Sequence, residues 1–252
     1  MSFQEEISPN VKLILPSMYK DIKENYLTLE NLIGIYSRLH DNGIIEINVN
    51  TDNFNNDFNT EMNFAFKRYF NWFKDKNAVE NVSITGISSN LELGPGSTRF
   101  STISTSLSEI IYTIIKYSQA YKYLDQSYLS YFKVSEYFRF MTYKNGGQHF
   151  PHYDSDYVFN NSDYVTKYSL VVYHNKCEDG ELYFCNDERN SSDSKFIITS
   201  DWDRQVREEE IYLKIKPDNL KIVIFPHTLC HGVLPFTGNE RNIIRGDLIF
   251  KG

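Results

Sequence analysis

Apolar residues recur along this chain at two different spacings, and the change between them falls near residue 130. Upstream, the spacing is that of amphipathic helices, in which apolar positions repeat every three or four residues. The predicted helices are 19–40, 60–75 and 106–124. The last begins with Ser106-Leu-Ser-Glu109, a capping box that satisfies free backbone amides at the start of a helix. Residues 43–49 alternate and predict a strand, and Asp-Asn-Gly at 41–43 predicts the end of the first helix.

Downstream of residue 130, the apolar residues come in short runs rich in Val, Ile, Tyr and Phe, bounded by Gly, Asn and Asp. Such runs are typical of strands. The predicted strands are 134–143, 167–174, 181–185, 195–199, 211–215, 220–225 and 242–250. Strands that follow one another without intervening helices indicate an antiparallel sandwich or barrel. We therefore predict an α+β protein with a double-stranded β-helix core, a cupin-like jelly roll, and N-terminal supporting helices.

The domain organisation follows from length and from the lack of an obvious linker in the 252 residues. A chain of this size can bury a substantial core. We predict a single catalytic domain over 1–252, in which 1–130 give mainly helical support and 131–252 form the double-stranded β-helix core. Leu93 to Arg99 contains two glycines and a proline and is predicted to be a loop.

Charge and cysteine content narrow the class of protein. The chain has 26 basic and 33 acidic residues and a net charge of -7, which argues against a nonspecific nucleic-acid binder with a basic face. Cys177, Cys185 and Cys230 are an odd number in a chain too large to need disulfides, so we expect free thiols and a reducing compartment. The acidic N-terminus and the lack of a long uncharged apolar run argue against secretion and membrane spanning. We expect a cytoplasmic protein.

The residues that point to chemistry begin with His152-Tyr-Asp154. In an extended backbone, side chains two residues apart point to the same face, so His152 and Asp154 would lie together. A third ligand would come from another strand, and residues 220–226 predict a buried strand that ends just before His227 and His231. Two imidazoles and one carboxylate hold non-haem Fe(II) and leave positions open for substrate and O2. These residues predict an iron site.

Four blocks of sequence between residues 134 and 250 carry a family resemblance. They are Tyr143 and Gly146-Gly147 before His152-Tyr-Asp154; Tyr168 to Tyr173 with Asp179-Gly-Glu-Leu-Tyr-Phe184; His231-Gly-Val-Leu-Pro235; and Gly238 to Phe250. In this order they resemble the prolyl-4-hydroxylase-like branch of the Fe(II)- and 2-oxoglutarate-dependent dioxygenases. Asp179 departs from the pattern, because the family usually has the first of two glycines there.

The resemblance assigns roles to particular residues. It implies that His152, Asp154 and His231 bind the iron, and it selects His231 over His227 because a proline follows four residues later and an arginine ten residues later. The cofactors it implies are Fe(II), with 2-oxoglutarate and O2 as cosubstrates and ascorbate as a further candidate.

The second carboxylate of 2-oxoglutarate needs a cation, for which a guanidinium fork is well suited. Arg241 has the spacing from His231 that the resemblance implies, and Arg245 faces the same way in an extended strand. One of the two would hold this carboxylate while the other pairs with the iron-proximal end or with Asp247, and we favour Arg241 for the carboxylate. Tyr143 either supplements the salt bridge through its hydroxyl or is a core tyrosine.

The remaining polar residues are predicted to have lesser roles. His227 would lie in the layer around the metal ligands or on the surface, His149 in a turn, and Asp156 in the loop at the mouth of the site. His40 and His174 are predicted to be structural.

The reaction implied by the resemblance is hydroxylation of an unactivated C–H bond, with 2-oxoglutarate converted to succinate. The leading substrate is a peptidyl proline or another amino-acid side chain, so a protein or peptide is the expected partner. Two alternatives stay open: a dioxygenase acting on a nucleic acid or a free small molecule, and a non-catalytic cupin-like metal-binding protein. Specificity is expected to lie in the N-terminal helices and in the loops 155–166 and 186–210.

Overall fold

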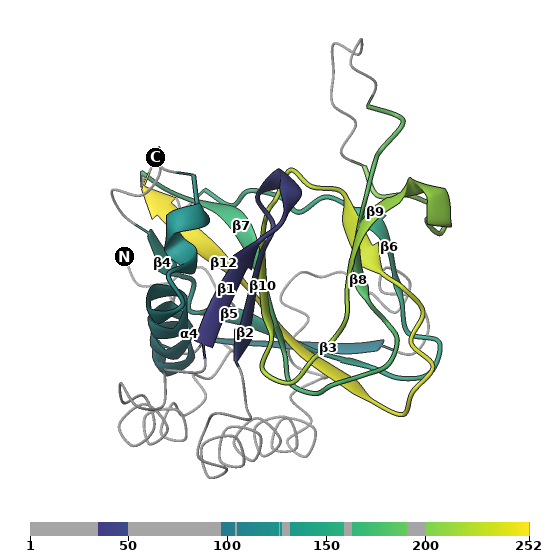
Figure 1. Ribbon diagram of the computed structural model, residues 1–252, viewed down its shortest axis with the longest axis horizontal. Helices are drawn as coiled ribbons and strands as arrows, with labels where there is room; N and C mark the ends of the chain where they lie inside the picture. Colours follow the sequence, from purple (N-terminus) through teal and green to yellow (C-terminus); the bar gives the residue numbers. More distant parts are fainter. Residues whose placement is uncertain are drawn as a thin grey trace.

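The computed structural model describes residues 35–49, 97–103, 105–125, 127, 132–158, 163–190 and 200–251. Within these ranges the strands form two antiparallel sheets that face each other (Figure 1). The large sheet has the order β1-β2-β10-β7-β12-β5-β3, with β4 paired to β12, and the small sheet has the order β6-β11-β8-β9. The large sheet consists of β1 (Ile35–Leu39), β2 (Ile45–Val49), β3 (Ser97–Ile103), β4 (Phe132–Val134), β5 (Tyr137–Tyr143), β7 (Tyr164–Tyr173), β10 (Ile222–Pro226) and β12 (Arg241–Lys251), and the small sheet of β6 (His149–His152), β8 (Leu182–Cys185), β9 (Ile211–Ile215) and β11 (His231–Val233).

The central strand β10 of the large sheet is buried on both faces, and its sequence shows how this is achieved. Ile222 and Ile224 pack into one core cluster with the helix α4 (Thr105–Tyr117). Val223 and Phe225 point the other way, into a second cluster that the small sheet shares. Successive side chains of a strand alternate between faces, so burial on both sides requires an unbroken apolar run rather than an alternating one.

Helix α4 covers the outer face of the large sheet (Figure 1). Its buried stripe is Leu107, Ile110, Ile111, Ile114 and Ile115. The helix predicted over 106–124 is confirmed to Tyr117, after which Ala120–Tyr123 form the short 3-10 helix η5. None of the helices in the described ranges is both long and apolar enough to span a membrane.

The first strand corrects a prediction. Ile35–Leu39 were predicted as the end of a helix over 19–40, but they form β1, which pairs with β2 from Ile35–Val49 to Leu39–Ile45. Asn42 and Gly43 have φ values of 61° and 75°, so the expected helix stop is a tight hairpin connection, which residues of this type favour. The rest of that predicted helix and the one over 60–75 lie outside the described residues.

Most of the other predicted strands agree with the structure, but β6 and β11 lie where no strand was predicted. The predicted strand 134–143 is divided into β4 and β5, and 195–199 lies outside the described residues. Ser97 to Arg99 were predicted as a loop but belong to β3, so that prediction is wrong there. Three strands from residues before 130 thus join the large sheet in addition to α4. The α+β double-stranded β-helix fold is confirmed; the single domain over 1–252 stays a prediction.

The small sheet carries three of the histidines, His149, His152 and His231. Its outer face packs against a third cluster that includes Tyr183, Cys185, Trp202 and Cys230. The backbone amide of Trp202 donates to the carbonyl of Pro151 on β6, which ties the segment after residue 200 to this sheet. The three cysteines are free thiols, and the sulfur atoms of Cys185 and Cys230 are 3.5 Å apart.

Candidate metal centre

Two neighbouring strands of the small sheet bring His152 and His231 together. His152 ends β6 and His231 begins β11, and the two residues are directly paired in the antiparallel ladder. Their ring centroids are 4.3 Å apart, and both side chains are buried. Residues 79 positions apart in the sequence therefore meet because the strands pair at this register.

Backbone carbonyls orient both imidazole rings in the same way. The Nδ1 atom of His152 lies 2.9 Å from the carbonyl oxygen of Phe150, and that of His231 lies 2.9 Å from the carbonyl oxygen of Leu229. An Nδ1–H that donates to a carbonyl leaves Nε2 with its lone pair free, which is the tautomer that binds a metal ion. Each histidine is thus positioned through the residue two places before it.

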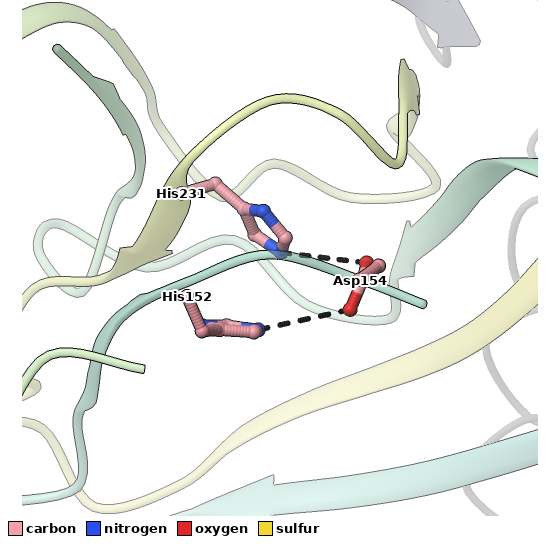
Figure 2. A group of neighbouring side chains, drawn as sticks. All are labelled: His152, Asp154 and His231. Atoms are coloured by element: carbon pink, nitrogen blue, oxygen red, sulfur yellow. Dashed lines mark ion pairs between the residues drawn. The ribbon is translucent and has the colours of Figure 1, made fainter. Parts of the chain in front are cut away.

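Asp154 completes the group from the loop that follows β6. Its carboxylate oxygens lie 3.8 Å from Nε2 of His152 and 3.5 Å from Nε2 of His231 (Figure 2). One ligand atom of each of the three residues lies within 4.8 Å of the others. Two further residues hold the carboxylate: Ser169 donates its hydroxyl hydrogen to one oxygen, and the guanidinium of Arg245 pairs with the other.

The electrostatics of the group favour the protonation states that bind a metal. Burial and the positive charge of a neighbouring imidazolium at His152 lower the pKa of His231 to about 3. Burial also lowers the pKa of His152, although Asp154 opposes the shift. Burial raises the pKa of Asp154, but Arg245 and the two histidines outweigh it and hold that pKa well below its usual range. Neutral imidazoles and an ionised carboxylate need no deprotonation before metal binding.

Next to this group, the two sheets enclose a pocket to which β12 contributes two arginines. Arg241, Ile243 and Arg245 alternate along β12 and all line the pocket, as the strand geometry predicts. The other lining residues are Met141, Tyr143, His149, His152, Val171, Tyr173, Leu182, Phe225, His231 and Val233. The two predicted histidine ligands and both predicted cation sites therefore line one cavity, and Asp154 is tied to it through its ion pair with Arg245.

The two arginines of this pocket have different partners. Arg245 pairs with Asp154, as described above. Arg241 is only 1% exposed, its guanidinium donates to the carbonyl of Gly180, and its charged carbon lies 4.1 Å from the centroid of the Tyr143 ring. Among the described residues, no carboxylate pairs with Arg241, and its Nε atom has no hydrogen-bond acceptor. Arg241 is thus a buried cation with room for an anionic partner.

Two glycines, Gly180 and Gly232, lie so close to neighbouring side chains that no larger residue would fit. Gly180 has a φ of 73°, and a Cβ atom there would lie 2.9 Å from the Arg241 guanidinium. A Cβ at Gly232, the residue after the ligand His231, would lie 2.2 Å from the Tyr183 hydroxyl oxygen. A side chain at either position would force its neighbours apart. Gly180 is also the second glycine of the family pattern, in which Asp179 replaces the first.

The structure agrees with only part of what was predicted for His227 and His149. His227 is buried rather than on the surface; its Nδ1 is 3.0 Å from Asp156 and its Nε2 is 3.4 Å from Asp247. It lies outside the group of three ligands, in agreement with a place in the layer around them. The prediction that His149 occupies a turn is wrong, because it begins β6 and lines the pocket. Ser169 was not predicted, and no sequence motif marks it.

The comparison with protein families bears on the chemistry of this site. Residues 138–246 match the family model of the 2OG-Fe(II) oxygenase superfamily. This segment is a 2OG-Fe(II) oxygenase core. It contains the three candidate ligands, Tyr143 and both arginines, and the superfamily implies Fe(II), 2-oxoglutarate and O2. The match confirms the predicted superfamily, enzyme class and cosubstrates, whereas ascorbate stays a prediction.

Several solved structures match the chain at low sequence identity. The structure of OsALKBH1 matches with a TM-score of 0.51 and 9% identity, over 83% of this chain and 100% of that one. A Pseudomonas putida prolyl-4-hydroxylase matches with a TM-score of 0.44 and 14% identity, over 94% and 98%. The viral collagen prolyl hydroxylase of Paramecium Bursaria Chlorella virus-1, in its 2OG complex, matches with a TM-score of 0.40 and 17% identity, over 68% and 86%. No curated protein matches the chain in sequence.

Proposed function

We propose that this 2OG-Fe(II) oxygenase core hydroxylates an unactivated C–H bond of a peptidyl proline or another amino-acid side chain. His152, Asp154 and His231 would hold the Fe(II), and Arg241 would hold the distal carboxylate of 2-oxoglutarate. The observation that carries the proposal is the buried Arg241, which lines the same pocket as the two histidine ligands and has no carboxylate partner among the described residues.

The residues present fit both groups. A buried charge is stable only when it is paired, and removing the partner of a buried ion costs about 3 to 5 kcal/mol. The Gly180 carbonyl and the Tyr143 ring offset part of this cost for Arg241, and a bound carboxylate would neutralise the charge. A 2-oxo diacid bound with one end at the metal ligands and its second carboxylate at Arg241 would supply this negative charge.

The chain's own groups define the conditions for the reaction. The bound metal and cosubstrate supply the oxygen chemistry. Phe150 and Leu229 fix the rings of the two histidines through their carbonyls, and Arg245 and Ser169 fix the carboxylate of Asp154. The apolar walls of the pocket, including Val171, exclude bulk water.

A protein or peptide substrate is supported by the motif resemblance rather than by the fold, because one fold serves many substrates. The blocks that carry it are the Tyr143 strand with its glycine turn, the His152-Tyr-Asp154 pair, and His231 with an arginine ten residues later. The cytoplasmic location expected from the sequence stays a prediction.

A screen of defined substrates tests this proposal. The Fe(II)-loaded protein would be incubated with 2-oxoglutarate, O2 and a peptide library, and products would be identified by a mass increase of one oxygen atom. We expect hydroxylated peptides with wild type and none with Arg241→Leu, which keeps all three metal ligands. Oxidation of nucleic acids or free small molecules in parallel arms, without any peptide product, would replace this substrate class by the alternative one.

A further inference from the structure

A third histidine enters the pocket because of an irregularity in β6. Between the pairs His152–His231 and His149–Val233, β6 advances by three residues and β11 by only two, so β6 contains a bulge. Residues three apart in a regular strand face opposite sides, but an extra residue restores the same side. The bulge contains Pro151, which has no amide hydrogen to contribute to the ladder.

The ring of His149 confirms this geometry. Its centroid lies 3.9 Å from that of His152, and the side chain lines the pocket together with both histidine ligands. His149 is not a member of the group whose ligand atoms lie within 4.8 Å of one another. Among the described residues, neither of its ring nitrogens has a hydrogen-bond partner. The imidazole therefore offers polar atoms to the pocket without being part of the metal-ligand set.

The register of the small sheet gives the level of His149 along the pocket. His152, His231 and Phe184 form one row across the strands, and His149, Val233 and Leu182 form the next row. These rows are separated by two residues of β8, roughly 7 Å at the rise of a strand. Two residues further along the same chain is Gly180, whose carbonyl accepts from Arg241. His149 thus lies one row from the metal ligands, on the side toward Gly180, the residue that binds Arg241.

We propose that His149 binds the 2-oxo acid, donating or accepting a hydrogen bond along its path from the metal to Arg241. This inference rests on the proposed function, because it assumes that a 2-oxo acid occupies that path. It adds a polar contact to a stretch of pocket whose neighbouring wall, at Val233 and Leu182, is apolar. His149 would then help to select the cosubstrate among 2-oxo acids of different length and polarity.

Calorimetric titration of 2-oxoglutarate into the Mn(II)-loaded protein without O2 tests the contact, because it measures binding and not turnover. For His149→Phe, which keeps a ring but removes both nitrogens, we expect the dissociation constant to rise about ten-fold, the effect of one hydrogen bond to a charged group. His149→Asn and His149→Gln each keep a polar atom near one ring nitrogen, and one of them should restore most of the affinity. His40→Phe, a histidine that pairs with Glu46 between β1 and β2, is the matched control.

Two further measurements, of Mn(II) affinity and of 2-oxoglutarate affinity, show whether this inference or the proposed function is wrong. Mn(II) affinity should be unchanged in His149→Phe; a parallel loss would mean that His149 only supports the ring of His152, and the inference would be wrong. Equal 2-oxoglutarate affinity in wild type and His149→Phe would also overturn it while leaving the proposed function intact. If wild type itself does not bind 2-oxoglutarate, the proposed function fails, and this inference fails with it.

Discussion

The two sheets contribute opposite halves of the site. The small sheet supplies His152 and His231 as neutral donors, and the ring of each is fixed by the backbone carbonyl two residues before it. The large sheet supplies Arg241 and Arg245, which are fixed cations on one strand. Asp154 lies between them, paired with Arg245 and near both imidazoles. The metal half of the site, formed by His152, Asp154 and His231, is thus arranged before any ligand binds. The cation half, formed by the two arginines, keeps the charge of Arg241 for a ligand to neutralise.

The comparison shows how two arginines of one strand can differ in their partners. Arg241 and Arg245 are four residues apart and face the same pocket, yet within the part of the chain that the structure describes only Arg245 pairs with a carboxylate. Under the proposed function, the same guanidinium chemistry would orient a metal ligand in Arg245 and bind the cosubstrate in Arg241. The predictions below separate these two uses.

The largest effect is expected from the metal half. Replacing His152, Asp154 or His231 with Ala should abolish Fe(II) binding, because each supplies one of three protein bonds to the ion. Anaerobic equilibrium dialysis measures the binding, and circular dichroism checks that the fold persists. His227→Ala is the control and should retain the metal. If His227→Ala lost the metal and His231→Ala kept it, the assignment of the distal ligand would be wrong.

The second largest effect is expected from replacing Arg241, which has no carboxylate partner among the described residues. Arg241→Leu should weaken 2-oxoglutarate binding by about a hundred-fold or more, since a buried carboxylate without its guanidinium costs about 3 to 5 kcal/mol. Titration of 2-oxoglutarate into Mn(II)-loaded protein measures the change, and the Mn(II) affinity itself should stay close to wild type. A larger loss of 2-oxoglutarate affinity in Arg245→Leu than in Arg241→Leu would exchange the roles of the two arginines.

A smaller effect, on the metal, is expected from the groups that hold Asp154. Arg245→Leu and Ser169→Ala should each weaken Mn(II) binding by about ten- to a hundred-fold, which is the usual effect of losing an outer partner of a metal ligand. Competition with a metal-indicating dye measures these affinities. Thr166→Ala, on the same strand as Ser169, is a matched control because its hydroxyl accepts from the Tyr157 amide instead. Unchanged Mn(II) binding in both test variants would contradict the role given to this layer.

The smallest effect concerns pH in the metal-free protein. The pKa of His231 falls from an ordinary value of 6.5 to about 3 in the folded state. Between these values the unfolded chain binds a proton that the folded chain does not, so stability decreases as pH falls from about 6.5 towards 3. Urea unfolding at a series of pH values measures the slope. His231→Asn should flatten it, and an identical slope in that variant would show that other groups dominate.

The sequence predicted the site better than it predicted the N-terminal part of the sheet. His152-Tyr-Asp154 could be read locally, because alternation along a strand places two such side chains on one face. The helical spacing that ran into β1 was misleading, since five residues are compatible with either period and the pairing with β2 decides between them.

The position of His149 also depends on non-local structure. The bulge that brings it into the pocket is defined by the pairing of β6 with β11, and Pro151 is its only local signal. Ser169 likewise meets Asp154 only because β7 packs beside the end of β6 in the folded chain. Contacts of this kind have no repeating pattern along the sequence.

The central claim is that the two halves of the pocket act together on 2-oxoglutarate. Succinate formation from 2-oxoglutarate by the Fe(II)-loaded protein, with no other substrate added, tests it most directly. We expect slow formation of succinate by wild type that requires O2, and none by His231→Ala or Arg241→Leu. A wild-type protein that binds both Fe(II) and 2-oxoglutarate yet forms no succinate with O2 would contradict the account and favour a non-catalytic metal-binding protein.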